Sequence, residues 1–155
     1  MRTTQRAGIW VLAALALAMT TPGFASEPEA STILQTAKIN GIEGGVLKAG
    51  RFTLTVPAGS YIGHADVGIA VPHPNATVCE VQIFPHPSRD FEVPFLLSAD
   101  LQDASVDVLP NLAVLSFDTS KREWLTVPGS SVDWMGEEVE APLSHFSTFM
   151  VGDPE

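Results

Sequence analysis

The sequence predicts an all-β protein, an antiparallel β-sandwich of short strands. From Ile33 to Val151, short apolar or alternating runs are separated by turn residues. No window holds the 3.6-residue hydrophobic period of an amphipathic helix for three turns. The chain has 12 Gly and 12 Pro, the residue types that tight turns between short strands require. Strands that follow one another at this spacing indicate two packed sheets.

A secretory signal peptide is predicted over residues 1–25. A basic start with Arg2 and Arg6 precedes an uncharged run over residues 7–19, and Gly23-Phe24-Ala25 places small residues where signal peptidase reads. That run is shorter than the roughly 20 residues that span a bilayer. We therefore expect export to the periplasm or outside the cell, with no membrane span once the signal is removed.

The mature chain is expected to hold one domain. Residues 26–32 contain Glu27, Pro28 and Glu29 and are expected to form a flexible tether, followed by a single domain over residues 33–155. Without the signal peptide, 18 acids stand against six Lys and Arg, a formal net charge of −12. Such a surface repels nucleic acid and anionic lipid. The expected partner is a protein or a cell-envelope component, and no cofactor is expected.

Alternation places the individual strands. The apolar positions that recur along them are Phe52, Leu54 and Val56; Val67, Ile69 and Val71; Cys79, Val81 and Ile83; Phe95 and Leu97; Leu112 to Phe117; and Trp124 to Val127. The turn signals between them are Gly44-Gly45, Ala49-Gly50, Pro57-Ala58-Gly59, Pro72 to Asn75, Pro85 to Asp90, Pro128-Gly129 and Met135-Gly136. Cys79 is the only cysteine, which excludes an internal disulfide, and its place in an alternating strand favours a buried thiol over a nucleophile.

Three connections have specific expectations. Pro94 interrupts an apolar run, so the strand there is expected at a sheet edge or at a bulge. Residues 133–137 are expected to form a tight hairpin in which Gly136 takes a positive φ. The longest irregular connection runs from Ala99 to Pro110 and has room for a short helix or a crossing between sheets.

The closing stretch, Ala141 to Val151, is predicted to be one terminal strand with His145-Phe146-Ser147 near its start. In a regular strand Phe146 shares a face with Thr148 and Met150. Ser147 then shares the other face with His145, Phe149 and Val151.

The order of these motifs resembles the ZU-five domain family, which occurs in ankyrins, netrin receptors and many secreted bacterial proteins. The matching stretches are Gly44-Gly45-Val46, Phe52 to Ser60, Phe91 with Pro94, Leu112 to Phe117, Glu123-Trp124, and Val139 to Val151 with Ser144-His145-Phe146-Ser147. The resemblance covers about Ile39 to Val151 and implies a β-sandwich used as a scaffold or interaction module. The partner domains that usually follow it in eukaryotic proteins are not in this sequence.

The same resemblance implies one chemical hypothesis. Some members of the family cleave themselves between Phe and Ser of such a triplet by an N-to-O acyl shift. Here Ser147 would attack the carbonyl of Phe146, His145 would accept the hydroxyl proton, and water would hydrolyse the ester. The preferred interpretation is structural, with His145 and Ser147 hydrogen-bonded on one face and Phe146 directed into the core. No catalytic residue is therefore expected.

Metal ligands and sugar-stacking side chains give a third hypothesis, a metal- or carbohydrate-binding module. The candidate ligands are His64, Asp66, His73 and His86. Because His73 and His86 each lie between two prolines, rigid loops with exposed imidazoles are preferred, and no metal site is expected. Asp100, Asp103 and Asp107 lack the spacing of a calcium loop.

The remaining features indicate no enzyme. No G-x-S-x-G elbow, His-Glu-x-x-His motif or Gly-rich phosphate loop is present. In the family pattern Trp124 is expected in the core, which leaves Trp134 as the aromatic candidate for sugar stacking. Asn75-Ala76-Thr77 fits a glycosylation sequon.

Overall fold

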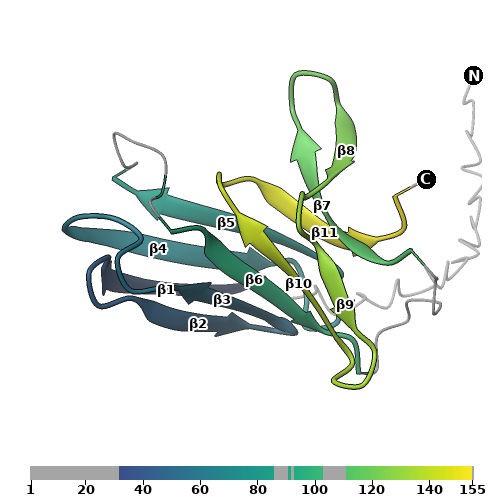
Figure 1. Cartoon of the computed structure of the whole chain (residues 1–155), viewed down its shortest axis with the longest axis horizontal. Helices are drawn as coiled ribbons and strands as arrows, with labels where there is room; N and C mark the ends of the chain where they lie inside the picture. Colours follow the sequence, from purple (N-terminus) through teal and green to yellow (C-terminus); the bar gives the residue numbers. More distant parts are fainter. Residues whose placement is uncertain (1–31, 86–90, 92, 103–110, 155) are drawn as a thin grey trace, which may run out of the picture.

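The structure, a computed structural model, describes residues 32–85, 91, 93–102 and 111–154. They form two antiparallel sheets packed together, which confirms the predicted sandwich (Figure 1). The six-stranded sheet has the order β1 (Ile33–Asn40), β4 (His64–Val71), β5 (Val78–Phe84), β11 (Thr148–Gly152), β7 (Ala113–Asp118) and β8 (Glu123–Thr126). The five-stranded sheet has the order β2 (Gly45–Ala49), β3 (Phe52–Val56), β6 (Phe95–Asp100), β10 (Glu138–Leu143) and β9 (Ser131–Asp133).

The core lies between the two sheets, where the predicted alternation is confirmed. In β3, β4 and β5 every second side chain is buried, and the large residues buried there are Phe52, Leu54, Val56, Val67, Ile69, Val71, Val81 and Ile83. Phe95 of β6 and Phe149 of β11 face them and are fully buried. Because burial of such a side chain contributes about 1.5–3 kcal/mol, this alternation fixes which face of each strand turns inward.

The prediction that Ala141 to Val151 form one terminal strand is wrong. Residues 138–143 form β10 in the five-stranded sheet, residues 148–152 form β11 in the six-stranded sheet, and residues 144–147 cross between them. β9 pairs with β10 only up to Glu140, so the ladder on that side ends before Pro142, which has no N–H to donate. Phe149 and Val151 share one face of β11, as predicted, and this face is the buried one.

The expectation for Pro94 is also wrong. β6 lies between β3 and β10, in the middle of its sheet, and carries no bulge in its pairing with either neighbour. Pro94 comes immediately before Phe95, the first residue of the strand. The missing N–H therefore removes no ladder hydrogen bond.

The hairpin between β9 and β10 forms as predicted, but Gly136 acts for a different reason. The residue with a positive φ is Glu137, at 52°. The Asp133 carboxylate accepts hydrogen bonds from the backbone N–H groups of Met135 (3.0 Å) and Gly136 (3.1 Å). A Cβ atom on Gly136 would lie 2.7 Å from that carboxylate, so glycine leaves room for the side chain that caps the turn.

Trp124 is exposed by 36%, which corrects its predicted place in the core. It belongs to β8, an edge strand whose four residues are all exposed, and its ring packs on Phe117 of β7 at a centroid distance of 5.2 Å. Figure 1 shows the β7–β8 hairpin rising away from the rest of the sandwich. Of the predicted connection from Ala99 to Pro110, residues 103–110 lie outside the described residues, while Ala99 and Asp100 belong to β6.

Gly44 and Gly59 both have a positive φ, but only Gly44 lies so close to other atoms that a side chain would clash. Gly44 and Gly59 have φ values of 76° and 83°. A Cβ atom on Gly44 would lie 2.4 Å from the carbonyl oxygen of Val56, whereas one on Gly59 would meet nothing within 4 Å. A left-handed backbone costs an L-residue about 1–2 kcal/mol, and a clash adds about 1–3 kcal/mol.

We predict that Gly44→Ala lowers the free energy of unfolding by about 3 kcal/mol and Gly59→Ala by about 1 kcal/mol. Urea denaturation of the two variants beside the wild type measures both values. Equal losses would contradict the close approach at Gly44.

Candidate functional site

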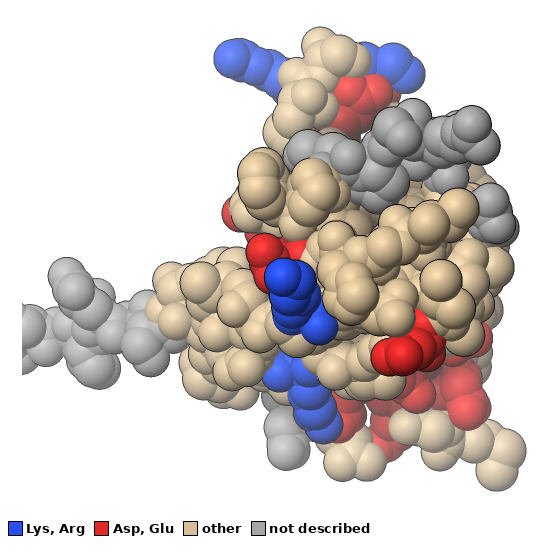
Figure 2. All heavy atoms as spheres, turned by 90° about the vertical axis from the view of Figure 1, so that its left-hand side faces the viewer, with Lys and Arg blue, Asp and Glu red and all other residues tan. Residues whose placement is uncertain are grey.

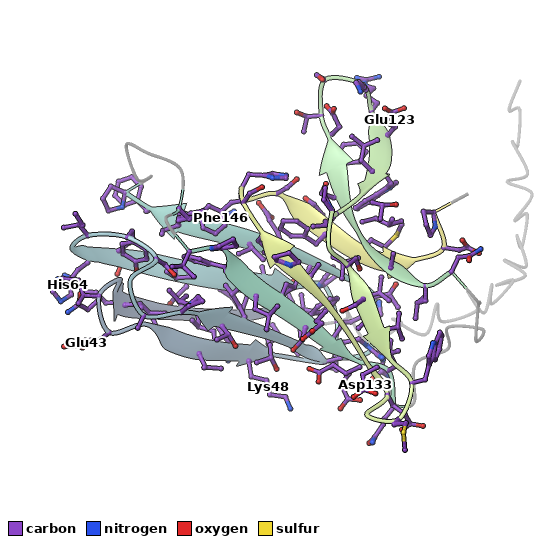
Figure 3. The ribbon with its side chains drawn as sticks, in the orientation of Figure 1. Glu43, Lys48, His64, Glu123, Asp133 and Phe146 are labelled. Atoms are coloured by element: carbon purple, nitrogen blue, oxygen red, sulfur yellow. The ribbon has the colours of Figure 1, made fainter. Side chains whose placement is uncertain are left out.

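The His145-Phe146-Ser147 triplet lies in the crossing segment, residues 144–147, where the chain leaves β10 and enters β11. Ser144 and His145 are exposed, and Phe146 and Ser147 are partly buried. Figure 3 shows Phe146 beside the end of β10, far from the β9–β10 hairpin that carries Asp133. The triplet is thus a connection between sheets rather than the start of a strand.

Phe146 anchors this segment in an aromatic cluster. Its ring lies edge-on to Phe95 at 5.3 Å and 72°, and edge-on to Phe91 at 5.0 Å and 74°. Edge-to-face pairs of this kind contribute about 0.5–1.5 kcal/mol beyond their buried area. The prediction that Phe146 turns toward the core is confirmed, although it does so from a connection rather than from a strand.

Ser147 is held between two strands of the six-stranded sheet. The backbone N–H of Val81 in β5 donates to the Ser147 carbonyl at 3.1 Å. On the other side, the Ser147 hydroxyl donates to the carbonyl of Phe117 in β7 at 3.0 Å. The Ser147 hydroxyl therefore links the crossing segment to β7.

His145 has different neighbours. Its Nδ1 lies 3.4 Å from the hydroxyl of Ser144, and its ring centroid lies 6.1 Å from that of Phe149. An acyl shift requires a base in contact with the attacking hydroxyl. Among the described residues, no hydrogen bond joins His145 to Ser147, so the adjacency in sequence does not produce a nucleophile–base pair in this conformation.

The metal candidates do not converge within the described part of the chain. His64 and Asp66 share the exposed face at the start of β4, and Figure 3 places His64 at one end of the sandwich beside Glu43. His73 follows the other end of β4, roughly 23 Å away along an eight-residue strand. The described residues contain no group of three His, Cys, Asp or Glu placed to hold an ion, and His86, Asp103 and Asp107 lie outside them.

The two mature tryptophans lie on different sheets. Trp124 belongs to β8 of the six-stranded sheet, and Trp134, exposed by 48%, belongs to the β9–β10 hairpin of the other sheet. They form no common aromatic face. Asn75 of the sequon is exposed in the turn between β4 and β5.

Cys79 is fully buried, as the alternation of β5 predicted. Burial raises the pKa of its thiol far above the usual range because the charged thiolate would lose its hydration. A thiol without thiolate character and without access to solvent is not a nucleophile.

The sequence did not reveal a groove of about 970 Å³ on the six-stranded sheet. Residues of all six strands line it, together with the triplet and Thr119. Its carboxylates come from Asp66, Glu80 and Asp118, and no Lys or Arg is among its lining residues. The only sequence signal was the set of residues on the outward faces of two strands. Asp66 shares that face with small residues along β4, and Glu80 shares it with Gln82 and Phe84 along β5.

Asp118 at the edge of this groove is held in its charged form. The Ser120 side chain donates to its carboxylate, as do the backbone N–H groups of Lys121 and Ser120, and these hydrogen bonds lower the pKa of Asp118 below its usual value. Lys121 itself pairs with Glu123 at 3.5 Å on the hairpin, outside the groove. The groove therefore carries negative charge at neutral pH.

The chain matches no protein-family model, and a comparison with curated proteins gives no significant match. The described residues contain no helix with the length and apolar character that crossing a membrane requires.

We predict that Cys79 reacts with a thiol reagent such as dithiobisnitrobenzoate only after unfolding, because the native fold excludes both the reagent and the thiolate. Absorbance of the released thionitrobenzoate, with and without 6 M guanidinium chloride, measures this. Rapid stoichiometric labelling of the native protein would contradict the buried position.

Proposed function

We propose that the protein is an exported, non-enzymatic β-sandwich module, similar to the ZU-five domain, with a protein-interaction or structural role in the periplasm or outside the cell. The observation that carries this proposal is the open groove on the six-stranded sheet. It combines a large concave surface with polar and apolar lining residues, as binding sites generally do. The signal-peptide pattern of residues 1–25 supports export.

Charge supports a partner other than nucleic acid or anionic lipid. The mature chain has a formal net charge of −12, with 18 acids against six bases. Figure 2 faces the end of the sandwich that carries Glu43 and His64, and the Lys and Arg side chains on the described surface there lie next to Asp and Glu side chains. Nucleic acid binding depends on clustered Lys and Arg, which this face does not present.

The environment of the triplet supports a structural role over self-cleavage. The Ser147 hydroxyl donates a hydrogen bond to the carbonyl of Phe117, and the Ser147 carbonyl accepts one from the N–H of Val81. Removing the hydroxyl would leave a partly buried carbonyl without that donor, which costs about 0.5–1.5 kcal/mol. Ser147 thus has a stabilising function that needs no chemistry.

We predict that intact-mass spectrometry of the purified mature protein shows one uncut species. The variant Ser147→Ala should be uncut as well. The variant should unfold with a free energy lower by about 0.5–1.5 kcal/mol, measured by urea denaturation.

Ser144→Ala is the matched control, because Ser144 is exposed and its hydroxyl contacts only His145. It should unfold within about 0.5 kcal/mol of the wild type. A fragment that begins at Ser147, present in the wild type and absent from Ser147→Ala, would establish self-cleavage and overturn the non-enzymatic proposal.

A further inference from the structure

The lining of the groove indicates the chemistry of its ligand. Carboxylates from three strands, Asp66, Glu80 and Asp118, face a surface without Lys or Arg. Lys38 lies opposite Asp66 in the β1–β4 register, but it is not among the lining residues. An anionic ligand in the groove would meet three carboxylates, with Lys38 as the cation beside Asp66, whereas Lys or Arg side chains would find acceptors at Glu80 and Asp118 as well.

The uncharged lining residues suit a peptide backbone. Thr36 and Thr148 place hydroxyl groups on β1 and β11 that can donate to a carbonyl or accept from an N–H. The Gln82 amide of β5 donates to Glu80 at 2.6 Å, and its carbonyl can still accept from an N–H. The strands beneath are already paired with their neighbours, so a ligand on this face is recognised by side chains rather than by strand addition.

Apolar side chains in the lining provide the remaining contacts. Leu34 and Phe84 are exposed by 63% and 72%, and Leu125 of β8 is exposed as well. Single exposed apolar residues are common, but these three border one concave surface. They would gain by covering aliphatic side chains of a bound chain.

The length of the groove sets the length of that chain. Six strands about 4.8 Å apart span roughly 24 Å from β1 to β8. An extended peptide covers this distance with about seven residues. A neutral glycan would make less use of the three carboxylates, and both mature tryptophans, the best surfaces for sugar stacking, lie outside the lining.

We propose that this groove binds an extended cationic segment of a partner protein, about seven residues long, in which Lys or Arg alternate with apolar residues. The carboxylates of Asp66 and Glu80 accept the cationic groups, and Leu34 and Phe84 cover the apolar ones. This inference rests on the proposed interaction role and assigns its surface and the charge of its partner.

The test uses the mature protein and a fluorescein-labelled heptapeptide of alternating Lys and Leu, with fluorescence anisotropy as the readout. The wild type should bind it and not the matched Glu and Leu heptapeptide. The double variant Asp66→Asn/Glu80→Gln should weaken binding by about five- to thirtyfold, since each charge pair at a solvated site contributes about 0.5–1 kcal/mol. Phe84→Ala should also weaken binding, although it leaves the net charge unchanged.

The matched control is Glu138→Gln/Glu140→Gln, which removes two exposed carboxylates from β10 of the other sheet. It should bind the cationic heptapeptide within about twofold of the wild type. Circular dichroism melting curves of all variants verify that each is folded.

The possible failures are distinguishable. Equal weakening by both double variants would overturn the groove as the site and leave an interaction role driven by overall charge. Binding of cellohexaose or of the acidic heptapeptide instead of the cationic one would overturn the assigned ligand while retaining a binding module. No binding of the cationic heptapeptide up to 1 mM would overturn this inference, whereas only cleavage at Ser147 overturns the non-enzymatic proposal.

Discussion

The six-stranded sheet depends on how the chain crosses from β10 into β11. β11 is the last strand in sequence, yet it lies between β5 and β7 and joins β1, β4 and β5 to the β7–β8 hairpin. Ser147 fixes its entry through hydrogen bonds to both neighbouring strands, and Phe146 fixes the crossing through the aromatic cluster. A triplet with the composition of an active site is thereby explained by the demands of the fold.

The sequence predicted the parts of the fold that alternation determines. In β3, β4 and β5, a period of two identified both the strand and its buried face, because one face of each strand packs on the core. It could not show that residues 141–151 change sheets, since β10 and β11 each alternate regularly. Trp124 was misplaced because a large apolar side chain on an edge strand has the same local pattern as one in the core.

The groove was beyond sequence prediction for a related reason. Asp66, Glu80 and Asp118 are far apart in sequence, and each alone is typical of a solvated surface. Only the strand order, in which β11 brings the β4–β5 pair and the β7–β8 hairpin into one sheet, places them around a shared surface. The same strand that makes the sheet continuous therefore makes the groove continuous.

The groove on the six-stranded sheet is the surface that we propose for binding. Two-dimensional ¹H–¹⁵N correlation spectra of the labelled mature protein, recorded during titration with the cationic heptapeptide, test it most directly. Binding in the groove would change chemical shifts mainly in β4, β5 and residues 145–148 and leave the amides of β2 and β9 unaffected. Shift changes centred on the five-stranded sheet, or spread evenly over the acidic surface, would contradict it.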